Sequence, residues 1–190
     1  HPGVHVNDGP HRGVLPVDHP VLDGIHGDPA RADAGRLLLD SAPLDVAETV
    51  SLCLEQYAPL AEEAGIRLVD ETSSATVVAD EGLLIQVLVN LLDNALAHTP
   101  AGGTIAAGCA QSDEWVEIWV SDTGEGIAPE HQARVFDRFY RVDAGRARAD
   151  GGTGLGLALC KAIVEAHHGK ISLTSEVGKG TRVDILLPVA

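Results

Sequence analysis

The stretch Gly151-Gly152-Thr153-Gly154-Leu155-Gly156-Leu157 carries four glycines within six positions. Glycine lets the backbone adopt positive φ and lets a ligand approach it closely. The apolar residues that follow share one face of a predicted helix. A glycine-rich turn that opens a helix directs unpaired N–H groups, and the positive end of the helix dipole, at an anion. The stretch is therefore typical of a phosphate site, although a flexible hinge before a helix has the same composition.

Charge is distributed unevenly along the 190 residues, whose formal net charge is −15. Such an acidic chain argues against a nucleic-acid surface or an anionic membrane as a partner. Residues 68–133 contain no Lys or Arg, whereas six basic residues lie around the glycine stretch: Arg134, Arg138, Arg141, Arg146, Arg148 and Lys161. This gathering favours an anionic small molecule as the ligand. A solvated charged loop would explain the exposure of these cations but not their location.

Composition divides the chain into two parts. Residues 1–29 hold five His, five Pro and five Gly without helical or strand periodicity. We predict an irregular or disordered segment there. The remainder is long enough for one domain with a sizeable core. Three scattered cysteines indicate neither a zinc site nor a disulfide framework, which fits a reducing, cytoplasmic location.

Periodicity predicts alternating helices and strands after residue 44. Helices are expected at residues 45–63, at residues 80–99 with Asp80 as N-cap, at residues 131–140, and directly after the glycine stretch. Strands are expected at residues 66–70, 76–79, 104–110, 114–121, 170–176 and 181–188. The pattern indicates a mixed α/β domain.

Polar side chains recur every four residues on one face of the second long helix: Gln86, Asn90, Asn94 and His98. Such a face can simply be solvated. However, solvated faces favour Glu and Lys, and Asn is a poor helix former. Two Asn at i, i+4 therefore indicate a task such as metal or phosphate ligation.

Asp122 ends a predicted strand and leads into a Gly124-x-Gly126 turn. An Asp in this position can hold a ligand against bare backbone. The same residues can also form an ordinary Asx turn, and the local sequence leaves both possibilities open.

Four segments in fixed order resemble the N, G1, F and G2 boxes of sensor histidine kinases. They are Asn90-Leu91-Leu92-Asp93-Asn94-Ala95, Asp122-Thr123-Gly124-Glu125-Gly126-Ile127, Val135-Phe136-Asp137-Arg138-Phe139-Tyr140-Arg141 and Gly152-Thr153-Gly154-Leu155-Gly156-Leu157. The later Gly178-Lys179-Gly180-Thr181 is similar to the final glycine–threonine turn of that family. One box alone is weak, whereas all of them in order are not expected by chance.

The resemblance implies the Bergerat fold, an α/β two-layer sandwich whose mixed β-sheet is packed on one face by three helices. It implies that residues 45–190 are an ATP-binding catalytic domain and that residues 30–44 are the end of a dimerisation hairpin and a linker. It also implies Mg²⁺ as a cofactor with ATP. Asn94 would ligate Mg²⁺ and Asn90 would support it, which agrees with the preference of Mg²⁺ for oxygen ligands.

Further roles are carried over from the family residue by residue. Asp122 would accept a hydrogen bond from the adenine amino group, and Thr181 would join this contact through its hydroxyl, directly or through water. The remaining nucleotide contacts would be Gly124, Gly126 and Ile127 at the base, Gly152, Thr153, Gly154, Leu155 and Gly156 at the phosphates, and Arg138 and Arg141 as balancing charges. His98 could stack on the nucleotide. It follows Ala97, where many family members carry a basic residue and then Tyr.

The resemblance implies transfer of the γ-phosphoryl group of ATP to a histidine of a dimerisation domain, with a response regulator receiver domain as a further partner. None of the five His in residues 1–29 precedes Asp or Glu, so the phosphoacceptor is not expected within this chain. Two alternatives remain open. One is an ATPase of the gyrase or chaperone branch, which places Glu where this chain has Asn90. The other is a nucleotide-binding module without activity of its own.

Overall fold

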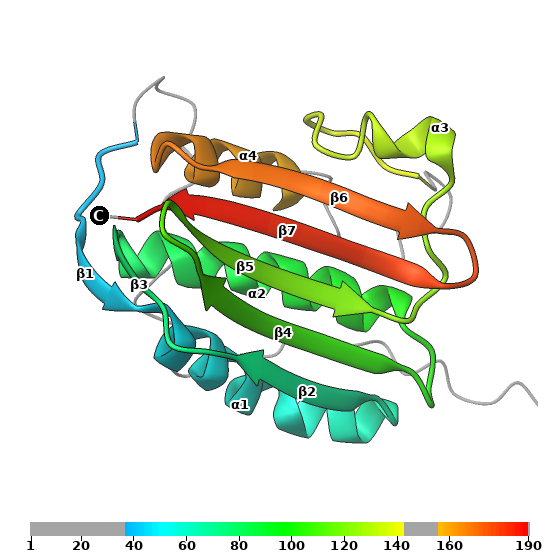
Figure 1. Cartoon of the computed structure of the whole chain (residues 1–190). Coiled ribbons are helices and arrows are strands. Elements are labelled where there is room, and N and C mark those ends of the chain that lie inside the picture. Colours follow the sequence, from blue (N-terminus) through cyan, green and yellow to red (C-terminus); the bar gives the residue numbers. More distant parts are fainter. Residues whose placement is uncertain (1–36, 143–155, 190) are drawn as a thin grey trace, which may run out of the picture.

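The computed structural model describes residues 37–142 and 156–189. One face of a five-stranded mixed sheet is covered by α1 (Val46–Ala64), α2 (Glu81–His98) and α4 (Gly156–Ala166) (Figure 1). The strand order is β2 (Arg67–Thr72), β4 (Thr104–Gln111), β5 (Trp115–Asp122), β7 (Gly180–Pro188) and β6 (Lys170–Glu176). Only β2 and β4 pair in parallel within this sheet. The predicted two-layer α/β sandwich is confirmed.

A second, two-stranded sheet joins β1 (Ala42–Asp45) antiparallel to β3 (Thr76–Ala79). The sequence analysis predicted β3 but placed residues 42–44 in a linker. These residues form a strand because β3 offers a partner, with Leu44 opposite Val77. A four-residue strand that contains Pro43 shows no period that a sequence alone could reveal.

The two long helices begin at Asp caps, close to the predicted residues. Asp45 accepts a hydrogen bond from the Glu48 N–H at 3.1 Å, and Asp80 accepts one from the Leu83 N–H at 3.1 Å. The backbone N–H of Asp80 in turn donates to Nε2 of the buried His167 at 3.0 Å. This contact ties the start of α2 to the end of α4. No helix in the described part of the chain is long and apolar enough to cross a membrane.

The predicted helix over residues 131–140 was wrong. Only the single turn α3 (Pro129–Gln132) is helical. It is followed by successive i to i+3 turns up to Tyr140, and Phe139 has a φ of 62°. Within residues 131–140, Val135 alone is buried, so no apolar stripe is present to hold a helix against the core.

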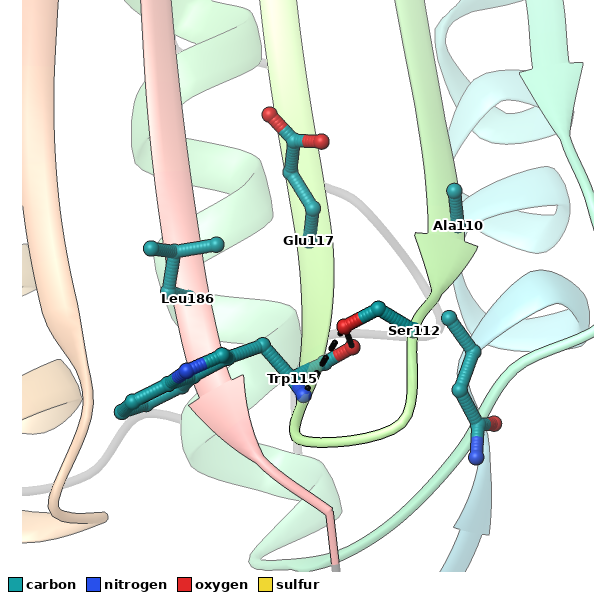
Figure 2. A pocket seen from close by; sticks show the side chains of 6 residues that line it. Ala110, Ser112, Trp115, Glu117 and Leu186 are labelled. Atoms are coloured by element: carbon teal, nitrogen blue, oxygen red, sulfur yellow. Dashed lines mark hydrogen bonds between the residues drawn. The ribbon is translucent and has the colours of Figure 1, made fainter.

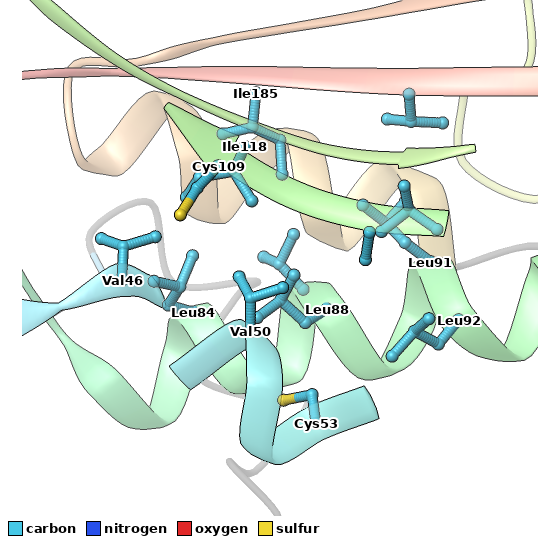
Figure 3. Close-up of a cluster of buried hydrophobic side chains, with 14 of the residues drawn as sticks. Val46, Val50, Cys53, Leu84, Leu88, Leu91, Leu92, Cys109, Ile118 and Ile185 are labelled. Carbon is cyan, nitrogen blue, oxygen red and sulfur yellow. The ribbon is translucent and has the colours of Figure 1, made fainter. Parts of the chain in front are cut away.

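The hydrophobic core fills the space between the helices and the inner face of the sheet (Figure 3). Leu88 and Leu92 of α2 lie across this layer from sheet residues such as Ile118 and Ile185, and all four are fully buried. Burial of each such side chain is worth about 1.5–3 kcal/mol relative to exposure. This packing holds α2 against β5. It therefore determines which residues of these two elements lie at the end of the core.

The outer face of the sheet is covered by its own side chains. The Trp119 indole lies over Gly108 and donates from Nε1 to Glu71 Oε2 at 2.8 Å. The Arg182 guanidinium lies 4.8 Å from the centroid of the same ring and is bonded to Asp184 at 2.8 Å. A hollow of about 240 Å³ remains at the β4–β5 turn (Figure 2) and is lined by Ala110, Gln111, Ser112, Trp115, Glu117 and Leu186.

Gly108→Ala is expected to destabilise the domain by roughly 1–3 kcal/mol, because an added methyl group overpacks this site. The new Cβ would lie 2.6 Å from Trp119 Cζ2 and 2.7 Å from the Glu71 carbonyl oxygen. Denaturant unfolding measures the change. In a Trp119→Leu background the same substitution should cost less. An equal loss of stability from Gly108→Ala in both backgrounds would show that the clash with the Trp119 indole is not its cause.

Candidate functional site

The inner face of the sheet changes from apolar to polar at one end. Val120 of β5 is paired with Val183 of β7, and both are buried. Two residues further from the core, Asp122 is paired with Thr181, which is also paired with Ser175 of β6. Because side chains alternate along a strand, these three lie on the same face as the core. All three are half-buried, and we call them the polar row.

Asp122 uses one of its carboxylate oxygens to order the local backbone. Its Oδ1 accepts hydrogen bonds from the Gly124 N–H at 2.8 Å and the Thr181 N–H at 3.3 Å. No described residue donates to Oδ2 of Asp122. Burial raises the pKa of this carboxyl group above its usual value, although the two N–H contacts and His98 act in the opposite direction. The polar row therefore contains a half-buried acceptor that the rest of the described chain does not satisfy.

Three glycines around the polar row are required by the chain's own backbone. An added Cβ would lie 2.3 Å from the His98 carbonyl oxygen at Gly124, 2.1 Å from that of Glu176 at Gly126, and 1.9 Å from that of Asp122 at Gly180. The φ angles of Gly126 and Gly180 are also positive. The loop after β5 thus packs backbone to backbone against the end of α2 and the β6–β7 turn. Contact of the base with Gly124, Gly126 and the adjacent Ile127 stays a prediction.

The amide face of α2 lies beside the start of α4. A Cβ at Gly156 would lie 3.9 Å from Cγ of Asn90. On the same side of α2 the buried thiol of Cys160 donates to the Val87 carbonyl at 3.8 Å, and burial raises the pKa of that thiol to about 12. Asn94, one helical turn along α2, is exposed. The structure therefore brings Asn90 next to Gly156, although the two were predicted from separate motifs.

His98 connects the amide face to the polar row. Its Nδ1 lies 2.8 Å from Glu125 Oε1, and its carbonyl oxygen accepts from the Glu125 N–H at 3.3 Å. In the structure the His98 ring pairs with Glu125. The stacking of His98 on a nucleotide stays a prediction. The contact holds the end of α2 against the turn that follows Asp122.

Several predicted site residues lie outside the described residues: Gly152, Thr153, Gly154 and Leu155. The irregular segment predicted for residues 1–29 also lies outside them. Arg138 and Arg141 follow α3, where Arg138 is exposed and Arg141 is half-buried. Their role at the phosphates stays a prediction.

Two residues of the site were missed by the sequence analysis. Ser175 accepts a hydrogen bond from the Ile127 N–H at 2.7 Å. Gln132 donates from Nε2 to the Ile127 carbonyl at 2.8 Å and to the Ser175 carbonyl at 2.9 Å. Ser175 could have been found, because it continues the inward-facing series that begins with Ile171 and Leu173 of β6. A polar residue at an inward position of an alternating strand is a usable signal.

The donor set on α2 suits Mg²⁺. Amide oxygens are hard ligands, and Mg²⁺ is commonly held by few protein groups together with phosphates and water. No three His, Cys, Asp or Glu gather into a metal site among the residues that the structure describes. An Mg²⁺ ion here would therefore depend on Asn94, Asn90 and phosphate oxygens.

Residues 79–190 match the family of histidine kinase-, DNA gyrase B- and HSP90-like ATPases. The chain belongs to this ATPase family. The chain is 42% identical over 159 residues to the sensor histidine kinase CusS of Escherichia coli strain K12, and 41% identical over 160 residues to the sensor protein SrrB of Staphylococcus aureus. Each alignment covers 84% of this chain, but only 33% of CusS and 27% of SrrB. The chain thus spans about a quarter to a third of the length of these relatives.

Solved structures support the same assignment. The chain superimposes on full-length ShkA in complex with AMPPNP with a TM-score of 0.75 and 34% identity, covering 85% of this chain and 34% of ShkA. The mycobacterial sensor histidine kinase MprB gives a TM-score of 0.66 and 29% identity, covering 78% of this chain and 97% of that one. The resemblance to histidine kinase catalytic domains and the predicted fold are confirmed.

Proposed function

We propose that this domain binds Mg-ATP and donates the γ-phosphoryl group to a histidine of a separate dimerisation domain in a two-component system. The observation that carries the proposal is the placement of Asn90, rather than Glu, beside the start of α4. An amide does not accept a proton from water at neutral pH, so a hydrolytic ATPase would lack its general base at this position. The similarity to sensor histidine kinases supports the same choice.

The described residues form two parts of the proposed site, one for the base at the polar row and one for the phosphates at α2 and α4. Oδ2 of Asp122 accepts from the adenine amino group at the polar row. Asn94, supported by Asn90, holds Mg²⁺, which neutralises phosphate charge when bound. The N-terminus of α4 at Gly156 lies beside Asn90, where its N–H groups favour phosphate. Phosphoryl transfer requires little covalent chemistry from the protein, so positioning and charge stabilisation suffice.

The similarity to sensor histidine kinases implies the partners of the domain. The phosphorylated histidine would pass its phosphoryl group to a response regulator receiver domain. We place the domain in the cytoplasm, with the formal charge of −15 opposing contact with nucleic acid or an anionic membrane.

Mixing this chain with the histidine-containing dimerisation domain of its parent kinase and γ-labelled ATP tests the proposal. We expect labelled phosphohistidine on the dimerisation domain and none on a matched domain whose histidine is replaced by alanine. Release of free phosphate without phosphohistidine would favour a hydrolytic ATPase. Nucleotide binding with neither product would leave only a binding module. Either result would contradict the proposal.

A further inference from the structure

The Ser175 hydroxyl is contacted by three groups at hydrogen-bond distance. Its Oγ lies 2.7 Å from the Ile127 nitrogen, 2.9 Å from the Gly180 carbonyl oxygen and 2.8 Å from Thr181 Oγ1. These groups come from the loop after β5 and from β7, so Ser175 joins both sides of the polar row. Nothing in the proposed chemistry so far uses it.

The capacities of these groups determine where the hydroxyl protons lie. A serine hydroxyl carries one proton and two lone pairs. The Ile127 N–H can only donate and the Gly180 carbonyl can only accept, so these two contacts use one lone pair and the proton of Ser175. If all three contacts are hydrogen bonds at once, one lone pair of Ser175 remains for Thr181, and the Thr181 hydroxyl donates to it. Only this arrangement makes each of the three contacts a hydrogen bond.

Thr181 consequently has no donor left for a ligand. Its hydroxyl proton is given to Ser175, and its backbone N–H is given to Asp122 Oδ1 at 3.3 Å. Thr181 Oγ1 and Asp122 Oδ2 are therefore both acceptors. Two acceptors in one row match a group with two N–H bonds and disfavour a second acceptor.

We propose that Ser175 is a positioning residue for nucleotide selection: it holds Thr181 as an acceptor, so that Thr181 and Asp122 together take the 6-amino group of adenine, directly or through one water. This inference rests on the proposed function, since it assigns the base to the polar row. It adds a residue that touches no nucleotide but decides which hydrogen-bonding face Thr181 presents.

The test compares two nucleotides that differ only at the 6-amino group. Calorimetry gives the affinities for ATP and for purine ribonucleoside triphosphate, which lacks that group and keeps the ring nitrogens. The wild-type chain should prefer ATP. Ser175→Ala should reduce this preference about two- to tenfold, the equivalent of one net hydrogen bond, because the freed Thr181 hydroxyl can donate to a ring nitrogen. Ser175→Thr keeps a hydroxyl and should restore the preference.

A double-mutant comparison separates positioning from structural support. Thr181→Val should reduce the preference for ATP, and adding Ser175→Ala to Thr181→Val should change it no further. If Ser175→Ala weakens both nucleotides equally and leaves the preference unchanged, Ser175 is only structural and the inference is overturned. Failure of the wild-type chain to bind either nucleotide would instead overturn the proposed function.

A measurement on the ligand-free wild-type chain serves if Ser175→Ala does not fold. A Thr181 hydroxyl that donates to Ser175 should exchange slowly with water and show a nuclear Overhauser contact to the Ser175 β-protons. Exchange of this hydroxyl at the rate of an exposed threonine would overturn the inference. Neither the exchange rate nor the nuclear Overhauser contact depends on phosphoryl-transfer activity.

Discussion

Asn94→Ala is expected to lower the Mg²⁺-dependent affinity for ATP by on the order of 100-fold or more, since outer partners of metal ligands alone are worth 10- to 100-fold. The melting temperature should stay unchanged or rise slightly, because Asn94 is exposed on α2 and Ala is the better helix former. Calorimetry with and without Mg²⁺, alongside thermal melting, measures both effects.

Two comparisons make the Asn94 result specific. Asn94→Asp keeps an oxygen ligand and should retain most of the Mg²⁺ dependence. In the presence of EDTA, wild type and Asn94→Ala should bind ATP with similar affinity, because no metal is left to distinguish them. A folded Asn94→Ala chain with the wild-type affinity for Mg-ATP would remove Asn94 from the metal site.

Asp122→Asn is expected to weaken ATP binding by on the order of 10- to 100-fold, the cost of leaving a buried polar group unpaired. The amide oxygen can still accept from the Gly124 and Thr181 N–H groups, so the fold should survive. The amide nitrogen would then face the adenine amino group, donor against donor. Nucleotides with an oxygen in place of the 6-amino group should gain affinity relative to ATP. An unaltered nucleotide preference would contradict the role of Asp122.

The same substitution should change how stability depends on pH. Burial raises the pKa of Asp122 in the folded chain above its ordinary value of 3.8. The folded state then binds this proton more readily than the unfolded state, so stability falls as pH rises through the interval between the two pKa values. Asp122→Asn removes the titrating carboxyl and, with it, this loss of stability at higher pH. Its melting temperature should therefore match or exceed that of wild type at neutral pH.

Thermal melts from acid to neutral pH test this expectation. The advantage of Asp122→Asn should shrink as pH falls toward 3.8, where the wild-type carboxyl becomes protonated in both states. A lower melting temperature for Asp122→Asn at neutral pH would show that the two N–H contacts to the carboxylate outweigh its burial.

The helices and the main-sheet strands were predictable because their signals are local. Asp80 and Gly65 mark helix ends through their own side chain or conformation, and strands such as β5 and β6 alternate between more and less buried positions. β1 was not predictable, because it exists only through its pairing with β3. The helix predicted at residues 131–140 was wrong beyond Gln132, where Phe139 is exposed rather than packed against the core.

The candidate site shows a similar limit. Asn90 and Asn94 share a helix, so their common face follows from the helical period. Asp122 and Thr181 lie on different strands, and only the β5–β7 register places them together. Local patterns carry no register information, so that pairing came from the family resemblance. Ser175 belongs to none of the boxes; the alternation of β6 could have marked it as a polar inward residue, but only its three contacts show what it does.

The backbone crowding around Gly124, Gly126 and Gly180 changes how genetic lesions in this domain should be interpreted. Glycine-box alleles are attractive as signalling-dead controls, on the assumption that they abolish nucleotide binding and nothing else. Here each added methyl group would meet a carbonyl oxygen of the chain itself at 2.3 Å or less. Such an allele would act through loss of the folded domain, so its phenotype could not be assigned to loss of nucleotide binding alone. A clean signalling-dead control for this chain lies on the exposed side of α2.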